Sequence, residues 1–274
     1  MNRSAKLLLL AAAVLPIVLA TGCNKLKARD QLNKGVTSYK NAKYEEAIGH
    51  FKESVNLDPE LINARLYLAT AYAQQYIPGI DTPENNRFGE QAIQEYENVL
   101  KADPKNINSV KGIAYLYLQM KRFDDAKKYY RQASDLDPND PETYYSIAVI
   151  DWTQSYQPRM EERAKLGLRP QDPLNDKTVC QQLHDANIGE VDEGVQMLQK
   201  ALELRPDYDD AMAYLNLLYR EKADLTCDNA DERAALNKTA DDWVEKTMAT
   251  KKANAEKKMQ SAGGITMDSE GTLK

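Results

Sequence analysis

A spacing pattern that recurs along the chain constrains its fold more than any other feature. A small residue is followed four positions later by an aromatic residue or Leu, three positions after that by a small or apolar residue, and five positions later by proline. The 4-3 spacing places three side chains on one face of a helix, and the proline ends that helix just beyond. The four copies are Ala47, Phe51, Ser54 and Pro59; Ala92, Tyr96, Val99 and Pro104; Ala126, Tyr130, Ala133 and Pro138; and Gly194, Leu198, Ala201 and Pro206.

A second amphipathic segment precedes each copy, for example Ile113-Ala114 with Tyr117, so the repeating unit contains two helices. Pro104 and Pro138 are about 34 residues apart, a period typical of arrays of helix pairs. The chain has only 12 Gly and 11 Pro in 274 residues and few β-branched runs, which also favours helices over strands. We therefore predict an all-α fold.

The pattern resembles the tetratricopeptide repeat, in which antiparallel helices A and B pack through small residues where they cross. The resemblance covers roughly residues 28–222 and implies an α-solenoid of about five helix-turn-helix repeats with inserted loops and a long C-terminal capping helix. Gly35, Ala69, Ala114 and Ala148 match the small residue of helix A. The implied repeats are residues 28–61, 62–106, 107–140, 141–208 and 209–259, within one solenoid over 28–259 and before a disordered tail at 260–274.

Two intervals exceed the repeat period and locate the inserted residues. Pro59 and Pro104 lie further apart than one period, and the extra residues fall in 74–88, where Thr82 precedes Pro83 as a helix cap. The interval from Pro138 to Pro206 is twice the period, which we interpret as an insertion at about 155–187 with short helices near 158–167 and 176–187. A degenerate extra repeat is the alternative.

The sequence over residues 1–22 predicts a leader that is removed from the folded protein. Met1–Lys6 carries two cations and no acid, and residues 7–20 form an apolar run that is too short to span a bilayer and typical of a signal peptide. The small residues at 20–22 precede Cys23 and resemble the lipobox of bacterial lipoproteins. The resemblance implies cleavage after residue 22, acylation of Cys23 and a lipidated tether at 23–27. A secretory signal with an incidental cysteine is the alternative.

Lipidation would hold the mature chain on a membrane without crossing it. Asn24 follows Cys23, instead of the Asp that retains lipoproteins at the inner membrane in some bacteria. We therefore expect a lipid anchor in the bacterial cell envelope, with the solenoid in the periplasm and the outer membrane favoured over the inner.

The other two cysteines form a candidate disulfide. Export would place Cys180 and Cys227 in an oxidising compartment, and both are expected in A-to-B connections of consecutive repeats, which share one edge of a solenoid. Two alternatives stay open. The pair could be buried free thiols, or Cys180 and His184 could form half of a metal site with Cys227.

Composition and motifs exclude several function classes. The formal charge of −6 lacks the basic excess of a nucleic-acid binder, and three cysteines with two histidines are too few for a multi-site zinc protein. The sequence contains no Gly-rich phosphate loop and no Gly-x-Ser-x-Gly or His-Glu-x-x-His motif. Acidic pairs such as Asp124-Asp125 are adjacent, and neighbouring helical residues diverge by about 100°. We expect no cofactor, no metal and no catalytic residues.

Function is therefore expected from surfaces. In the tetratricopeptide family the concave face is lined by helix A side chains, and a peptide or protein partner binds there. The inserted edge is a second candidate surface, because insertions into repeats often mark a binding face. Our leading hypothesis is a non-enzymatic scaffold or adaptor; the alternatives are a periplasmic carrier of small ligands and an enzyme with 155–187 as a lid. The residues that the resemblance places on the concave face include Asn63, Asn108, Lys111, Tyr115, Tyr145 and Trp152.

Overall fold

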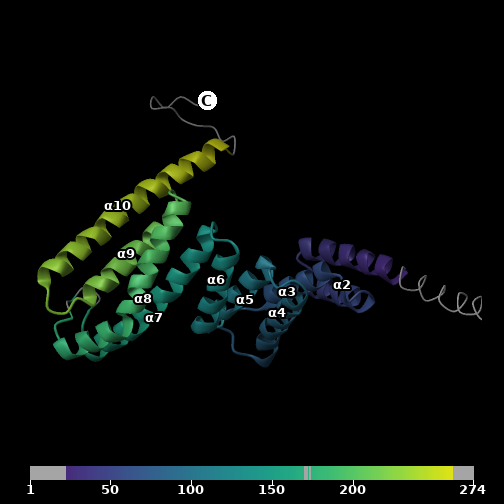
Figure 1. Cartoon of the computed structure of the whole chain (residues 1–274), viewed down its shortest axis with the longest axis horizontal. Coiled ribbons are helices and arrows are strands. Elements are labelled where there is room, and N and C mark those ends of the chain that lie inside the picture. Colours follow the sequence, from purple (N-terminus) through teal and green to yellow (C-terminus); the bar gives the residue numbers. More distant parts are fainter. Residues whose placement is uncertain (1–22, 170–171, 173, 262–274) are drawn as a thin grey trace, which may run out of the picture. The chain divides into compact units, whose positions relative to one another are not determined.

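The computed structural model describes residues 23–169, 172 and 174–261, and their secondary structure consists of helices arranged in consecutive antiparallel pairs (Figure 1). This is the all-α solenoid architecture, with a long C-terminal helix, that the sequence predicts. The predicted signal peptide and most of the predicted tail lie outside the described residues. The helices are residues 23–40, α2 (Tyr44–Leu57), α3 (Ile62–Gln75), α4 (Pro83–Ala102), α5 (Ile107–Gln119), α6 (Phe123–Leu136), α7 (Pro141–Lys165), α8 (Lys177–Leu204), α9 (Asp209–Asp224) and α10 (Ala230–Ser261).

The chain divides within α6 into two compact units. We call Met1–Tyr129 the N-terminal unit and Tyr130–Lys274 the C-terminal unit. In the first, α3 packs against α2 and α4, and α4 packs against α5; in the second, α7, α8 and α9 pack on one another and α10 packs on α9. Helix pairs begin at residues 62, 107, 141 and 209, where the second to fifth repeats were expected to begin.

Small residues occupy the helix crossings. Ala69, Ala114 and Ala148 have no exposed surface. A Cβ added at Gly35 would lie 2.4 Å from the ring of Phe51, so this crossing admits no side chain. The aromatic residues Tyr72, Tyr96, Tyr117 and Tyr130 are likewise buried and form part of the core.

The first insertion has the predicted helix boundaries. The helix α3 ends at Gln75, and α4 begins at Pro83 with Thr82 as its N-cap, whose side chain accepts a hydrogen bond from the backbone of Asn85. The rest of the extra length lies in α4, which has 20 residues. A connection over 76–82 is therefore held between two well-defined helix ends.

The second insertion differs from the prediction of two short helices. Instead, α7 continues without a break through Pro158 for 25 residues, α8 has 28 residues, and residues 166–176 connect them. Proline usually breaks a helix because it removes one hydrogen bond and crowds the preceding turn. Here the following turn is fixed from outside, because Arg159 and Arg163 form ion pairs with α9. Tertiary contacts thus override the local signal.

Three further features characterise the ends of the fold. Residues 23–27, expected as a tether, are exposed but already helical. The N-cap of α10 is Asn229, since its side chain accepts a hydrogen bond from the Glu232 backbone at 3.1 Å. On α10, Met248 is 68% exposed, whereas the neighbouring Thr247 is buried.

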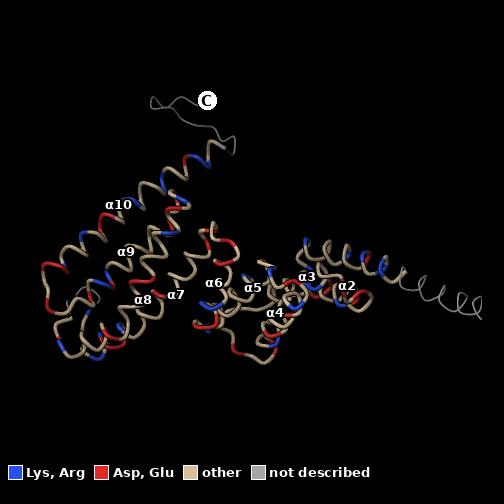
Figure 2. Tube along the Cα trace, in the orientation of Figure 1, with Lys and Arg blue, Asp and Glu red and all other residues tan. Residues whose placement is uncertain are grey.

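The two units carry different charge. Residues 23–129 contain 16 Lys and Arg against 14 Asp and Glu, whereas residues 130–274 contain 18 against 28. Figure 2 shows both signs along the described helices of each unit. The acidity of the chain therefore resides in the C-terminal unit.

Candidate functional site

The predicted concave residues fall into an open group in the N-terminal unit and a packed group in the C-terminal unit. Asn63 lies on α3, and Asn108, Lys111 and Tyr115 lie on α5, a helix that contacts α3 directly. Asn63 and Asn108 are exposed, and Tyr115 is 52% exposed. We call these four residues the α3–α5 face; it carries amide, ammonium and aromatic groups, of which the Lys111 ammonium is half-buried and already has an interaction partner.

Tyr145 and Trp152, by contrast, belong to an aromatic cluster within the C-terminal unit. The ring centre of Tyr145 lies 5.1 Å from that of Tyr208 and 5.4 Å from that of Tyr214, and Trp152 meets Tyr214 edge-on at 5.5 Å. Tyr156 also stacks on Trp152 at 4.7 Å. Such pairs contribute about 0.5–1.5 kcal/mol beyond area burial. Both predicted residues therefore hold α7 against α9, and neither is freely available to grip a peptide.

A charged edge borders this cluster. Glu142 accepts hydrogen bonds from the Tyr208 hydroxyl and, at 2.7 Å, from the Arg205 guanidinium, which also lies over the Tyr208 ring. Burial raises the pKa of the Tyr145 and Tyr208 hydroxyls well above their ordinary value. Both therefore stay protonated, and the edge is a fixed hydrogen-bonded network.

The sequence analysis missed a buried ionic network where α7 meets α9. Arg159 donates to Glu221 at 2.6 Å and to Asp224 at 2.5 Å, and Arg163 donates to Asp224 at 3.2 Å. Arg163 and Glu221 are each 1% exposed. Burial raises the pKa of the Glu221 carboxyl, and the charge of Arg159 acts in the opposite direction. The i,i+4 arginines and the i,i+3 acids were visible in the sequence, but their partners lie far along the chain, on another helix.

Arg163 also fixes the connection between α7 and α8. Its guanidinium donates to the backbone carbonyls of Arg169, at 2.6 Å, and Asp172, at 2.5 Å. The segment 155–187, considered as an enzyme lid, thus consists of two helix extensions and a connection held by a buried side chain. That arrangement does not favour a lid.

Cys180 and Cys227 are joined by a disulfide in the structure, with Cα atoms 5.6 Å apart. The prediction misplaced one of them, since Cys180 lies in the first turn of α8, while Cys227 lies in the connection between α9 and α10. His184 contacts the Leu225 carbonyl at 3.0 Å. The described residues contain no cluster of three or more potential metal ligands, at this point or elsewhere.

Cys23 is exposed and forms no disulfide. It lies at the beginning of the helix over residues 23–40, whose first buried side chain is Ala28. Within the described part of the chain, no helix has the length and apolar character needed to cross a membrane. The exposed position leaves the Cys23 thiol accessible to chemistry.

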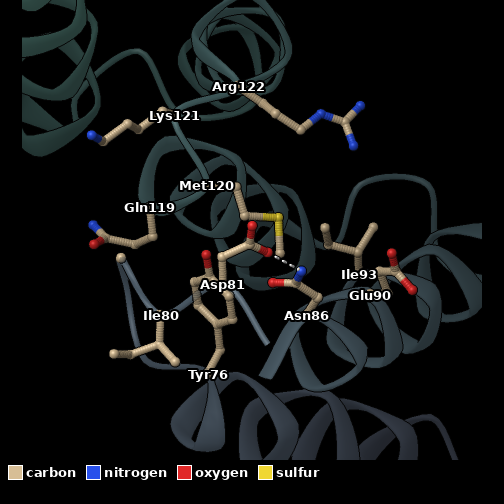
Figure 3. Close-up of a pocket in the computed structure, with 11 residues that line it drawn as sticks. Tyr76, Ile80, Asp81, Asn86, Glu90, Ile93, Gln119, Met120, Lys121 and Arg122 are labelled. Atoms are coloured by element: carbon tan, nitrogen blue, oxygen red, sulfur yellow. Dashed lines mark hydrogen bonds between the residues drawn. The ribbon is translucent and has the colours of Figure 1, made fainter. Parts of the chain in front are cut away.

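The inserted edge of the N-terminal unit holds a pocket of about 440 Å³ (Figure 3). Tyr76, Ile93 and Met120 supply apolar surface, and the connection over 76–82 forms one wall. Asn85, 6% exposed, fixes this connection: its amide donates to the carbonyls of Ile77 and Ile80 at 2.9 and 2.7 Å, and accepts from the Ile77 backbone at 2.8 Å. The pocket therefore has a preformed wall.

Comparison with known proteins agrees with this architecture. Residues 89–148 match the family described as the tetratricopeptide repeat. No curated protein matches the sequence significantly.

Several solved structures share the fold. A crystal structure of MamA protein is 13% identical with a TM-score of 0.56, covering 84% of this chain and 94% of its own. MamA 41-end from Desulfovibrio magneticus RS-1 is 16% identical with a TM-score of 0.57, covering 83% and 96%. YrrB, described as a TPR protein with an unusual peptide-binding site, is 16% identical with a TM-score of 0.52, covering 87% and 97%. At these identities the likeness concerns the fold alone, which is an all-α solenoid of the tetratricopeptide repeat type.

Proposed function

We propose that this protein is a non-enzymatic scaffold, anchored by lipid in the bacterial cell envelope, that binds a protein or peptide partner on the α3–α5 face. Tetratricopeptide solenoids present large surfaces relative to their cores. The observation that carries the proposal is the exposure of Tyr115 on a helix A surface, while the equivalent aromatic residues of the C-terminal unit are used in packing. A half-exposed Tyr offers apolar contact area and a hydroxyl at little entropic cost.

The chemistry of the α3–α5 face suits an extended peptide. Asn63 and Asn108 can donate to and accept from a peptide backbone, and Tyr115 can stack on a side chain. Lys111, which is half-buried and already has an interaction partner, adds a positive charge at the same face. YrrB, which shares the fold, is described as having a peptide-binding site.

Support for the anchor comes from the sequence before residue 23 and from the exposed Cys23 thiol. Acyl chains on Cys23 would place the membrane next to the exposed first turn, ahead of the packed residue Ala28. The disulfide between Cys180 and Cys227 is consistent with export, because disulfides persist in oxidising compartments. The outer membrane is the expected location.

The test of binding compares two substitutions of exposed side chains. The chain carrying Tyr115→Ala is purified from detergent-solubilised membranes beside the chain carrying Met248→Ala, an exposed position of the C-terminal unit. We expect a stoichiometric protein partner with the parent chain and with Met248→Ala, and its loss with Tyr115→Ala. Equal recovery of the partner with both variants would contradict the proposed face.

The anchor is tested separately by palmitate labelling. The parent chain should incorporate label and sediment with membranes, whereas Cys23→Ser should do neither. Labelling of the Cys23→Ser chain, or a soluble unlabelled parent chain, would contradict the lipid anchor and leave the binding test unaffected.

A further inference from the structure

Two isoleucines are held outward at the inserted edge of the N-terminal unit. Ile77 is 59% exposed and Ile80 is 48% exposed. A mobile connection could turn such side chains inward, but the three hydrogen bonds of Asn85 fix the backbone at both residues. Exposed apolar side chains on a fixed backbone, beside a pocket, are typical of an interaction site.

Some charged side chains around the pocket are paired, and others are not. Arg122 is paired with Asp125 at 2.6 Å, and Asp81 accepts from Asn86 at 2.8 Å, so these groups are satisfied. Lys121 and Glu90 line the pocket and are exposed, and within the described part of the chain neither side chain has a hydrogen bond or an ion pair.

Lys121 and Glu90 lie on different sides of Met120 in Figure 3. Lys121 is placed there by the left-handed backbone, φ 57°, that ends α5. The site thus offers an apolar centre with one unpaired charge of each sign beside it.

We propose that this pocket binds one large apolar side chain of a partner protein, from a segment with an acidic residue toward Lys121 and a basic residue toward Glu90. We call it the Ile80 pocket; its lining includes none of the four residues of the α3–α5 face, and the proposal does not depend on binding at that face. The volume of about 440 Å³ is within the usual range of ligand pockets. A polypeptide is favoured over a small molecule because it would cover Ile77 and Ile80 together with the pocket, and the opposite charges select a segment that carries both signs.

The test uses a synthetic peptide array and the purified chain from residue 23 onward. Each peptide has a central Leu, Ile, Met, Phe or Gly, with Asp or Glu on one side and Lys on the other, in both orders. The expected result is binding of apolar-centred peptides in one charge order, at least about tenfold tighter than their Gly-centred equivalents. Exchange of the flanking charges should weaken binding by about two- to fivefold.

Four variants test whether the binding takes place in the pocket. Ile80→Asp should abolish it, whereas Leu166→Asp, a half-exposed position of the C-terminal unit, should not change it. The double variant Lys121→Glu with Glu90→Lys should prefer the peptides with exchanged charges. Tyr115→Ala should leave this binding unchanged, which separates the Ile80 pocket from the proposed function. Circular dichroism checks that each variant is folded.

Several results would overturn the proposal. One is that no apolar-centred peptide binds better than the Gly-centred series. Another is concentration-dependent dimerisation, abolished by Ile80→Asp without any peptide binding, which would assign the surface to a second copy of this chain. A third is binding of a fluorescent apolar dye, lost in Ile80→Asp, with no peptide binding, which would indicate a small-molecule pocket. A double charge variant with unchanged peptide preference would remove the assigned roles of Lys121 and Glu90.

Discussion

In the N-terminal unit the helices α2 to α5 have 13 to 20 residues, whereas the helices α7 to α10 of the C-terminal unit have 16 to 32. The longer helices are joined by a disulfide, a buried ionic network and an aromatic cluster. The shorter ones pack through small residues and leave Tyr115, Ile77 and Ile80 exposed. Helix pairs of the same kind are thus cross-linked to one another in the C-terminal unit and leave apolar and aromatic side chains exposed in the N-terminal unit.

Unfolding of the two units can be followed separately, because both tryptophans, Trp152 and Trp243, lie in the C-terminal unit. Tryptophan fluorescence therefore reports unfolding of that unit, while far-ultraviolet circular dichroism reports the helices of both. A variant that affects one unit should change one signal more than the other.

The largest effect is expected from Glu221→Ala. This change leaves Arg159, 8% exposed, without the more buried of its two acidic partners, and breaking a buried ion pair costs about 3–5 kcal/mol. Denaturant unfolding followed by tryptophan fluorescence measures the loss. Asp241→Ala, which removes an exposed partner of Arg220, serves as the control and should cost less than about 1 kcal/mol. Equal effects of the two substitutions would contradict a structural role for the network.

Loss of the disulfide comes next. The bond closes a separation of 47 residues, for which the chain-entropy estimate gives a stabilisation of up to about 4 kcal/mol. Cys180→Ala with Cys227→Ala should lower the fluorescence midpoint and leave the part of the circular dichroism transition that belongs to the N-terminal unit in place. Two free thiols in the denatured, unreduced protein would mean that the bond does not form.

A smaller loss of stability, confined to the N-terminal unit, is expected from Asn85→Ala. This change removes three hydrogen bonds to the backbone of Ile77 and Ile80. Because the loop is partly exposed, we expect the free energy of unfolding to fall by about 1–2 kcal/mol. Hydrogen exchange should rise over residues 76–82, with the fluorescence transition unchanged. Exchange that stays at the parent rate would show that the connection is fixed by other contacts.

The smallest effect on stability is expected from Tyr115→Ala, because more than half of that side chain is already in solvent. We expect a change within about 0.5 kcal/mol in the free energy of unfolding, which is usual for surface substitutions. Urea unfolding followed by circular dichroism provides the measurement. A loss above about 2 kcal/mol, the range of packed side chains, would place Tyr115 in the core and remove it from the α3–α5 face.

The parts of the fold that the sequence predicted are those governed by local chemistry. Small residues such as Ala69 and Gly35 mark helix crossings, because no larger side chain fits there. Thr82 followed by Pro83 marks the beginning of α4, because the side-chain acceptor and the fixed φ of proline are both local properties.

The parts of the fold that the sequence did not predict depend on contacts with residues far along the chain. Pro158 indicated a helix end, but the arginines that follow it are held by Glu221 and Asp224, which lie on α9. Spacing alone placed Tyr145 and Trp152 on a concave face and could not show that Tyr214 would occupy the same space. Of the six predicted surface residues, the structure leaves Asn63, Asn108 and Tyr115 exposed.

Site-specific photocross-linking in intact cells tests the central claim most directly. A photoreactive residue is placed at Tyr115 in one chain and at Met248 in another, both of them exposed positions but in different units. Our account predicts one discrete protein adduct from position 115 and none from position 248. Adducts from position 248 alone, or none from either position, would contradict the assignment of partner binding to the N-terminal unit.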